Sequence, residues 1–584
     1  MRQLVAVGMR LHTRLERSRF GGDLLAALAG FGFFSFSVGF EKLNPRNVAW
    51  LTFGDQQQHL LGWWFYSSDQ WRWPLGANPR WGWEGTNSVV YTDSWPGMAL
   101  IFKALNIDAV DHGQYFGLGF LFGAIALFVG AQRLFRSLGC AVLPSLAASG
   151  LLGTTSVFWW MQRWYPALSA GLPILVWALY FYVADRKQRA PLWRRWSLLL
   201  IVTVATHAYL TIAVIPILGA VFIRRLIHDQ RTWGRLLTNF LVVGTCTAAT
   251  MFVLGYFSLP SKWAQTGGYG WYSANLLGLL DSNSASRFLP DIPSLSGQYE
   301  PTAFGLGTML LLAGVVIQRL RSKAPFGALS IARDHGPLIV VLLGLSLLAI
   351  TNTVSIASWS FRVPLPTRLE HGLSIFRSSA RLIWPALITA TVAITLSSLR
   401  RFRYAALAIS LAFAIQLFDT TPEIRSVALA ENGNTVSIAY DDAFWGGVPG
   451  QYTTIASLPA QSLGFDWVAC TFAAVTTGRS AECGYFSRVQ GLDAVNRARS
   501  SQVFDGALAP DVIYMVSRSW LVENKRELLK SFSKPEISAI AATDVDGFSP
   551  DTVFLFPGCP SRDACDFVGD HYRALDASLL TAES

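Results

Sequence analysis

Long apolar runs recur from the N-terminal region to residue 418, and no other feature of this sequence constrains its fold as strongly. A helix that crosses a bilayer needs ~20 mostly apolar residues. Nine runs approach or reach this length, at residues 22–40, 114–131, 140–160, 167–184, 237–257, 303–319, 336–352, 382–398 and 402–418. Only 14% of the 584 residues are charged, compared with ~25% in soluble globular domains. The runs predict a polytopic α-helical membrane protein and exclude an ordinary cytosolic enzyme.

A further apolar stretch, over residues 197–223, has arginine pairs on both sides. The pairs stand at 194–195 and 224–225. Since basic residues mark cytoplasmic loops, both ends of this stretch are expected on the same side of the membrane. We therefore expect two short helices that enter and return, meeting near His207. With this pair, the positive-inside rule gives about eleven transmembrane helices in all.

The other basic residues give the orientation, because they gather at the N-terminus and in alternate short loops. They are Arg2, Arg10, Arg14, Arg17, Arg19, Arg133, Arg136, Arg186, Lys187, Arg189, Arg319, Arg321, Lys323, Arg400, Arg401 and Arg403. No small-residue cleavage site follows the first apolar run, so we expect an anchor and not a removed signal peptide. The sequence predicts a multi-pass protein of the bacterial inner (cytoplasmic) membrane. Its N-terminus is expected in the cytoplasm and its C-terminal domain in the periplasm.

The net charge changes sign after the last apolar run. The chain has 47 basic and 37 acidic residues, which gives a net charge of +10. Residues 419–584 have a net charge of −9, whereas residues 1–418 have +19. Most of the positive charge lies in the expected cytoplasmic loops, so it does not indicate nucleic-acid binding. We expect a transmembrane domain over 1–418 and a soluble, mixed α/β periplasmic domain over 419–584.

The cysteines agree with an exported C-terminal domain. Four of the 6 cysteines follow residue 418, namely Cys470, Cys483, Cys559 and Cys565. In an oxidising compartment they imply two disulfides, of which we favour Cys470–Cys483 and Cys559–Cys565. Free buried thiols are the alternative. No spacing resembles a zinc site, so these cysteines are not expected to bind a metal. The sequence indicates no cofactor, and it gives no indication of a divalent metal.

Three expected outside loops are long, and they cover residues 41–112, 258–302 and 353–381. Loops longer than ~15 residues without obvious secondary structure tend to be functional. These loops also contain most of the ionisable and aromatic residues that the topology leaves unexplained. We therefore expect the chemistry in these loops.

The first loop offers three candidates for acid–base chemistry. Asp55 and Asp93 each precede an apolar segment that we expect to form a helix along the membrane face. Each carboxylate has a simpler interpretation as a helix N-cap. His59 lies four residues after Asp55, so the two side chains share a helix face. An imidazole beside a carboxylate is a candidate acid, base or phosphate partner, and interfacial packing is the alternative.

The third loop contains a cluster of basic residues that the positive-inside rule does not explain. Its charged residues are Arg362, Arg368, Glu370, His371, Arg377 and Arg381. The planar guanidinium group is well suited to binding phosphate. Arg377 and Arg381 are four apart at what we expect to be the start of a helix, so both can face one anion. A set of surface salt bridges with Glu370 is the alternative.

The second loop and the broken helix pair add candidates for substrate binding. Tyr269 and Trp271 lie in a glycine-rich segment and can stack on sugars or on lipid stems. Lys262 can meet an anion, and Glu300 stands just before the next apolar run. A mobile interfacial loop is the simpler interpretation of this segment. His207, an ionisable residue inside a membrane segment, is either functional or hydrogen-bonded between helices.

Several segments carry a family resemblance: WLTFGDQQQHLLGW, TDSWPGMALIFK, THAYL, GQYEP and FRSSARLIWP. With a cytoplasmic N-terminus, a long first outside loop, an outside arginine cluster and an outside C-terminal domain, the chain resembles the GT-C class of membrane glycosyltransferases. More narrowly, it resembles an uncharacterised bacterial family of multi-spanning proteins that is known only as a domain of unknown function. The resemblance covers nearly the whole chain.

The GT-C resemblance implies sugar transfer from a polyprenyl-phosphate donor, with inversion, to a hydroxyl of a glycan, lipid or protein at the outer face. In that class the acid of the first outside loop is the catalytic base, and this position matches Asp55. A second loop acid assists, and Asp93 is the nearest match. No acid directly follows Asp55, unlike in the paired-acid members, which argues against a metal-dependent mechanism.

The donor phosphate is expected to contact cationic side chains, and the sugar or lipid is expected to contact polar and aromatic ones. The phosphate-binding residues are expected to be Arg377, Arg381, Lys262, His371 and Arg362, and the substrate-binding residues Tyr269, Trp271, Glu300 and His207. A transporter or flippase for a lipid-linked glycan, or a non-catalytic subunit for envelope assembly, is the alternative function. A transporter would place ionisable residues near the middle of the membrane, whereas most of these lie in the outside loops.

Overall fold

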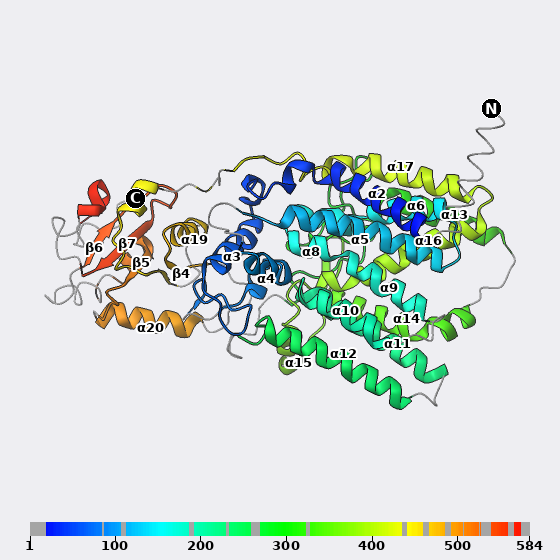
Figure 1. Ribbon diagram of the computed structural model, residues 1–584, viewed down its shortest axis with the longest axis horizontal. Helices are drawn as coiled ribbons and strands as arrows, with labels where there is room; N and C mark the ends of the chain where they lie inside the picture. Colours follow the sequence, from blue (N-terminus) through cyan, green and yellow to red (C-terminus); the bar gives the residue numbers. More distant parts are fainter. Residues whose placement is uncertain are drawn as a thin grey trace. The chain divides into compact units, whose positions relative to one another are not determined.

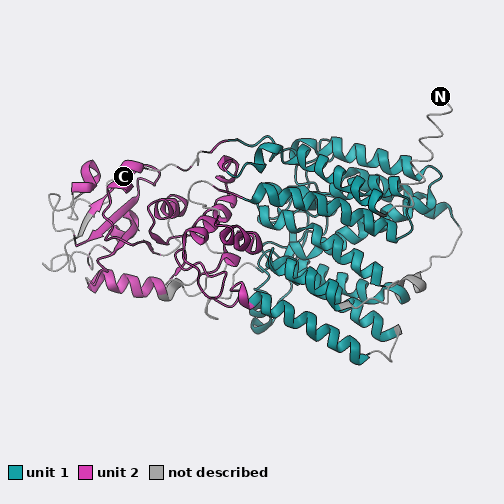
Figure 2. Ribbon diagram, in the orientation of Figure 1, with its two compact units in different colours: residues 1–45, 115–251, 267–432 teal, residues 46–114, 252–266, 433–584 magenta. Residues whose placement is uncertain are grey.

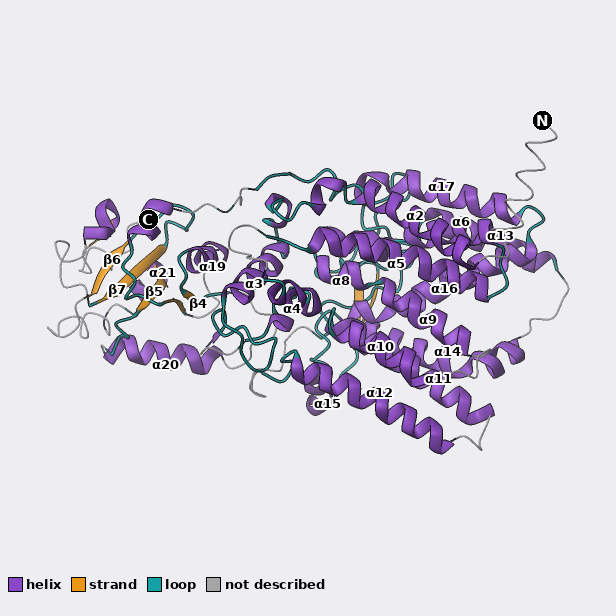
Figure 3. Cartoon of the chain, in the orientation of Figure 1, coloured by secondary structure: helices purple, strands orange, loops and turns teal. Residues whose placement is uncertain are grey.

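The computed structural model combines a helical bundle with a mixed β-sheet (Figure 1; Figure 3). The described residues are 19–83, 87–106, 113–185, 192–228, 233–258, 269–322, 328–434, 438, 441–459, 466–484, 492–505, 507–524, 526, 539–558 and 566–573. By packing, they form two compact units (Figure 2). Unit 1 comprises residues 1–45, 115–251 and 267–432, and unit 2 comprises residues 46–114, 252–266 and 433–584.

Unit 1 is the helical bundle of a multi-pass membrane protein. Within the described residues, 8 helices are long and apolar enough to cross a membrane. They are α2 (Arg19–Ser37), α5 (Phe116–Ser137), α8 with α9 (Pro166–Gly171, Pro173–Asp185), α11 (Ala208–His228), α12 (Trp233–Val253), α14 (Ala328–Ile350), η8 with α16 (Ser379–Ile383, Trp384–Arg401) and α17 (Ala405–Ile424). These apolar sequences form helices because an α-helix satisfies the hydrogen bonds of its backbone N–H and C=O groups within the segment itself, where lipid offers no partner.

Three further helices lie where spans are expected but are shorter than 18 residues. These are α6 (Val142–Gly153), α10 (Leu192–Val204) and α13 (Leu306–Arg321). The run predicted as one span over 140–160 is interrupted, because α6 ends at Gly153 and is followed by the short α7 (Ser156–Trp159) and η5 (Trp160–Arg163). The total of about eleven spans is therefore not confirmed.

The expected break near His207 is present, but the two helices that meet there differ in length. Helix α10 ends at Val204 and α11 begins at Ala208, with His207 in the break between them. At the far end of α11, Arg225 Nε donates to Asp185 Oδ2 at 2.8 Å, and Asp185 ends α9. The chain therefore leaves one end of the bundle after Asp185 and returns to that same end.

The two ends of the bundle differ in charge. We call the first the basic end, where Arg133 of α5 pairs with Asp23 of α2 at 2.8 Å and Arg225 pairs with Asp185. The opposite end, here the loop end, carries the break at His207 and the loops over 269–305 and 351–378. By the positive-inside rule, the basic end is expected in the cytoplasm.

At the loop end, Lys42 anchors the chain that follows α17. Lys42 lies in η1 (Phe40–Leu43), and its Nζ donates to the carbonyl oxygens of Ala430 and Glu431 (2.9 and 3.0 Å) and to Asn432 Oδ1 (2.7 Å). Burial lowers the pKa of the Lys42 ammonium to about 8. No role for this lysine could be predicted from the sequence, because its partners are almost four hundred residues away.

Replacing Lys42 with methionine is expected to loosen residues 430–432 locally. Removing the ammonium takes a hydrogen-bond donor from three oxygens, and each buried group left unpaired costs about 1–3 kcal/mol. Hydrogen exchange should show faster exchange over this segment in the variant. Glu41→Gln, at the exposed neighbouring position, serves as the control and should exchange like the parent. Equal exchange in the Lys42 variant and the parent would show that the anchor is unimportant.

Unit 2 contains a six-stranded mixed sheet in the order β4-β3-β5-β7-β6-β8. The strands are β3 (Thr454–Leu458), β4 (Ser480–Glu482), β5 (Val512–Ser517), β6 (Ala539–Ala542), β7 (Thr552–Pro557) and β8 (Tyr572–Arg573). Strand β3 pairs in parallel with β4 and β5, while the remaining pairs are antiparallel. Helix α19 (Asp466–Thr476) connects β3 to β4, and α20 (Leu492–Asp505) lies between β4 and β5 in the chain. The mixed α/β character expected after residue 418 is present.

The first long loop packs with this sheet, although the sequence analysis assigned it to the transmembrane domain. The Ala481 N–H donates to the Arg80 carbonyl (2.7 Å), and the Gly82 N–H donates to the Ala481 carbonyl (3.1 Å). Residues 80–82 therefore cover the edge of β4, which would otherwise offer unpaired backbone groups. This pairing cannot be predicted from local sequence, since its partners are about four hundred residues apart.

Aromatic rings also pack the first long loop against the sheet within unit 2. The Trp81 indole stacks on Phe65 (5.7 Å) and on Trp467 (6.4 Å), and its Nε1 donates to the Cys483 carbonyl at 3.0 Å. Phe65 belongs to α3 (Gln56–Ser68) and Trp467 to α19. The helix that follows Asp55 is thus part of the same core as the C-terminal sheet.

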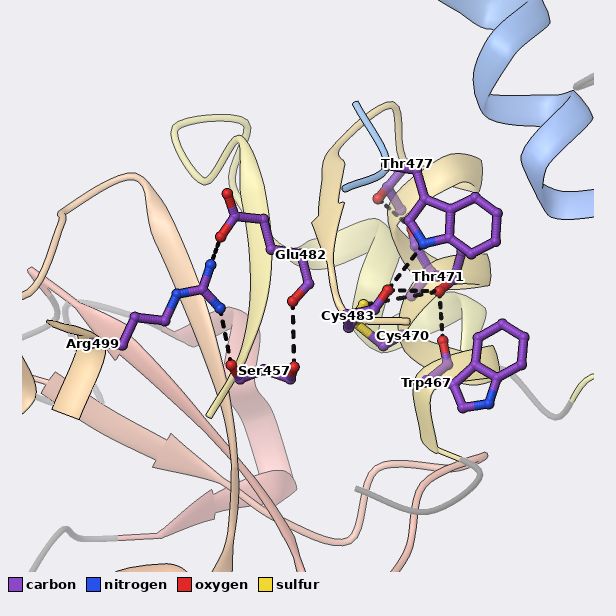
Figure 4. The surroundings of a disulfide bond; sticks show 10 residues. Ser457, Trp467, Cys470, Thr471, Thr477, Glu482, Cys483 and Arg499 are labelled. Atoms are coloured by element: carbon purple, nitrogen blue, oxygen red, sulfur yellow. Dashed lines mark hydrogen bonds and ion pairs between the residues drawn. A yellow bond between two sulfur atoms is a disulfide. The ribbon is translucent and has the colours of Figure 1, made fainter. Parts of the chain in front are cut away.

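The predicted Cys470–Cys483 disulfide is present (Figure 4). It ties α19 to the end of β4, and both cysteines are fully buried. Beside it, Arg499 of α20 pairs with Glu482 and donates to the Ser457 carbonyl at 3.1 Å. Cys559 and Cys565 lie outside the described residues, and Cys140 and Cys246 are free thiols.

Removing this disulfide is expected to destabilise unit 2 by ~3 kcal/mol. The reason is that the bond lowers the conformational entropy of the unfolded chain, by an amount set by the length of the loop that it closes. The measurement is urea unfolding of the full chain with both cysteines, which are 13 residues apart, replaced by alanine. Cys246→Ala, which removes a free thiol, is the control. Unchanged unfolding of the double variant would contradict the expectation.

Candidate functional site

Asp55 stands at the N-cap position of α3, but its side chain does not cap the helix. Its backbone is helical, with φ −67° and ψ −17°, and no backbone N–H of the first turn donates to the carboxylate. The side chain is half-buried and makes no hydrogen bond or ion pair with the residues that the structure describes. The structural interpretation of this aspartate as a cap therefore fails, and a half-exposed carboxylate is left without a structural partner in the described chain.

Asp93 lies in a strained turn before α4 (Pro96–Ala104). Its φ is +53°, a left-handed value that is uncommon outside glycine. The N-cap of α4 is Trp95, with φ +49°, so Asp93 does not cap that helix either. Such conformations persist where the surrounding structure imposes them, and they cluster at functional sites.

Packing brings the turn at Asp93 against the helix that follows Asp55. Ser94 Oγ donates to the carbonyl oxygen of His59 at 2.8 Å. A Cβ on Gly62 would collide with the hydroxyl oxygens of Ser94 and Thr92, so only glycine allows this approach. The two predicted acids thus belong to one local structure in unit 2. The His59 side chain is 1% exposed, so it lies in the packed interior of that structure.

In unit 1, Arg381 is the centre of a buried polar cluster. Its Nε donates to Glu300 Oε1 at 2.7 Å, and the two side chains are 5% and 1% exposed. The guanidinium also lies over the rings of Tyr165 (4.4 Å) and Tyr209 (5.2 Å). The expected phosphate ligand Arg381 and the expected substrate ligand Glu300 therefore neutralise each other.

Arg377 lies at the margin of this cluster and is half-buried. Its Nη2 donates to the Tyr272 hydroxyl at 3.3 Å, and the guanidinium lies over the Tyr272 ring at 5.3 Å. The expectation that Arg377 and Arg381 share one helix face is wrong, because Arg377 is in a turn and Arg381 is in the 3-10 helix η8. The two arginines still approach a common segment, since the Tyr272 carbonyl accepts from Ala380 N at 3.0 Å.

His207 connects the helix break to the third loop through Tyr209. The Tyr209 N–H donates to His207 Nδ1 at 3.2 Å, and the two rings lie 5.9 Å apart. The Tyr209 hydroxyl accepts from Ser378 N at 2.7 Å. Tyr165 and Tyr209 were not among the residues predicted from the sequence, although Tyr209 stands in the THAYL segment. An aromatic residue beside a membrane histidine was the available indication.

The remaining predicted residues lie in more ordinary surroundings. Arg362 pairs with Glu370 on the surface, which is the alternative that the sequence left open for this loop. His371 and Trp271 are exposed. Burial raises the pKa of the half-buried Tyr269 hydroxyl, with Glu370 adding to the effect. Lys262 lies outside the described residues.

The candidate residues thus form two groups, one in each unit. Asp55, His59 and Asp93 are in unit 2, while Arg377, Arg381, Glu300 and His207 are in unit 1. In the described part of the chain, no group of three or more His, Cys, Asp or Glu side chains could hold a metal ion. The chemistry that these groups offer is proton transfer at a carboxylate and anion binding at arginine.

A family model described as a domain of unknown function, DUF6311, matches residues 27–421, which is more than half of the sequence. The chain belongs to the DUF6311 family. The matched region of this DUF6311 protein runs from α2 to α17, so it includes the candidate residues of both units. No curated protein matches it.

Among solved structures, this DUF6311 protein is similar to the cryo-EM structure of the arabinofuranosyltransferase AftD from Mycobacteria. The sequence identity is 13% and the TM-score is 0.47. The similarity covers 92% of this chain and 40% of the AftD chain, so the DUF6311 protein spans less than half of AftD's length.

Proposed function

We propose that this DUF6311 protein is an inverting membrane glycosyltransferase of the GT-C class. It transfers a sugar from a polyprenyl-phosphate donor to a hydroxyl acceptor at the outer face of the inner membrane. The observation that carries the proposal is the half-buried Asp55 carboxylate, which occupies an N-cap position without capping and has no ion-pair partner in the described chain. In the GT-C class, which the sequence segments resemble, the acid of the first outside loop is the catalytic base.

The proposed reaction is a single displacement. Asp55 accepts the proton of the acceptor hydroxyl while the hydroxyl oxygen forms a bond to the anomeric carbon. The bond from that carbon to the phosphate oxygen breaks on the opposite face, and the bonding electrons leave with the polyprenyl phosphate. Asp93, in the turn packed against α3, assists by orienting the acceptor. His59 holds the helix in place from its interior position.

Negative charge grows on the departing phosphate, and cations stabilise it. Arg377 is the principal candidate, because it is half-buried and its guanidinium lies over the Tyr272 ring, next to the segment that contains Arg381. Arg381 acts through its pair with Glu300, which fixes the segment next to Arg377. Lys262, His371 and Arg362 are further candidates for the phosphate, and Tyr269, Trp271 and His207 for the sugar or lipid stem.

The test is transfer by the purified protein in vesicles, with a radiolabelled polyprenyl-phosphate sugar and a panel of glycan and lipid acceptors. Formation of a glycosidic product with inverted configuration supports the proposal. Movement of the intact lipid-linked sugar between leaflets, without any covalent product, would contradict it and favour a transporter.

A further inference from the structure

Large apolar side chains lie exposed on the loop over residues 351–378 of unit 1. The loop contains a hairpin of β1 (Thr353–Ile356) and β2 (Trp359–Arg362), followed by α15 (Thr367–Leu373). Six of its apolar side chains are 41–60% exposed, namely Ile356, Trp359, Phe361, Val363, Leu369 and Ile375. The rings of Trp359 and Phe361 lie 5.5 Å apart. We call these six residues the hairpin surface.

The hairpin is held firmly from its other side. Ser355 is fully buried, its hydroxyl accepts from Gln298 Nε2 at 2.7 Å, and its carbonyl accepts from Leu276 N at 3.0 Å. The amide of Asn275 donates to the Ala357 carbonyl (2.8 Å) and accepts from its N–H (3.1 Å). Strand β1 is thus bound to the second loop, whereas all four residues of β2 are exposed. The exposure belongs to a fixed structure.

Both ends of the loop lead directly into membrane-spanning helices. Helix α14 ends at Ile350, and the next span begins at Ser379. A strand of four residues extends by only ~13 Å, and the polar interface on each side of a bilayer is ~5–8 Å thick. The hairpin surface is therefore confined to the neighbourhood of the lipid headgroups.

The charges of the loop match an anionic interface. It contains Arg362, Arg368 and Arg377, together with His371, and Glu370 is its only acidic residue. Arg368 and His371 are exposed on α15 beside the hairpin surface. Tryptophan and phenylalanine with neighbouring arginine are typical of segments that lie in the interface of an anionic bilayer.

We propose that the hairpin surface lies in the outer headgroup layer, with Trp359 and Phe361 at the boundary with the acyl chains and Arg368 in contact with lipid phosphate. This contact with lipid sets the depth of the loop over residues 351–378 relative to the bilayer. The proposal is independent of the proposed enzymatic function, because it concerns lipid contact and holds equally for a transporter. Another surface of this same chain is the competing occupant.

The experiment places the photocrosslinker p-benzoyl-phenylalanine at position 359 of the full chain in vesicles of radiolabelled phosphatidylglycerol and phosphatidylethanolamine. Position 343, whose leucine in α14 is 60% exposed, is the positive control for lipid contact. Position 445, whose tryptophan is 1% exposed in unit 2, is the negative control. We expect a lipid adduct at position 359. Its yield should be at least roughly half of the yield at position 343, as for an interfacial side chain.

A second variant tests the role of charge without disturbing the hairpin. Arg368→Gln is expected to lower the share of phosphatidylglycerol in the adducts at 359 about twofold, while the adducts at 343 stay the same. A crosslink from 359 to another part of this chain would overturn the proposal, as would a lipid yield at 359 no higher than at 445.

Discussion

Replacing Asp55 with asparagine is expected to lower the rate of sugar transfer by about 10²–10⁴-fold, the usual effect of losing a general base. The amide has the size of the carboxylate but cannot accept the proton of the acceptor hydroxyl. Because the Asp55 side chain makes no hydrogen bond or ion pair in the described chain, the free energy of unfolding should change by no more than about 0.5 kcal/mol. A large loss of rate with little loss of stability distinguishes a catalytic carboxylate from a structural one.

The measurement compares initial transfer rates and thermal unfolding of the purified variants in the same vesicles. Asp69→Asn is the matched control, because Asp69 lies in the same loop and its carboxylate already accepts from Arg72 Nε at 2.8 Å. That control should retain most of the transfer rate. A folded Asp55 variant with the parent's rate would remove Asp55 from the mechanism and leave the proposed function without its main support.

Features encoded by local pattern could be predicted from the sequence. The apolar runs identify the helices of unit 1, since helix formation in lipid depends on the run itself. The break at His207 follows from arginines on both sides of one apolar stretch, and it is present between α10 and α11. The Cys470–Cys483 bond could be chosen because the two cysteines are close in sequence and lie in one small domain.

Features that depend on distant partners could not be predicted. Asp55 precedes a helix in the sequence, so a capping role was a reasonable expectation, and only the structure shows that the carboxylate makes no capping bond. The edge pairing of residues 80–82 with β4 joins the first loop to a sheet about four hundred positions later. The partner of Arg381 is Glu300, 81 residues earlier and in a different loop. No periodicity in either loop indicates such a pair.

Breaking the pair of Arg381 and Glu300 is expected to cost about 3–5 kcal/mol of stability, which is the second large effect. Arg381→Met leaves the Glu300 carboxylate buried without its cation, and Glu300→Leu leaves a buried guanidinium without its anion. Both side chains are at most 5% exposed, so water cannot compensate either charge. The double variant leaves no buried charge and is expected to lose much less than the sum of the single variants.

A double-mutant cycle on the exposed pair of Arg362 and Glu370 provides the control. This pair lies in the same loop, but its side chains are 64% and 30% exposed, so its coupling should be only about 0.2–1 kcal/mol. Unfolding of all variants by denaturant in one detergent gives both coupling energies. A coupling of Arg381 with Glu300 no larger than that of the exposed pair would show that the buried cluster does not stabilise unit 1. Strong coupling agrees with a structural role for Arg381, whose charge is neutralised by the Glu300 carboxylate, and with binding of the donor phosphate by Arg377.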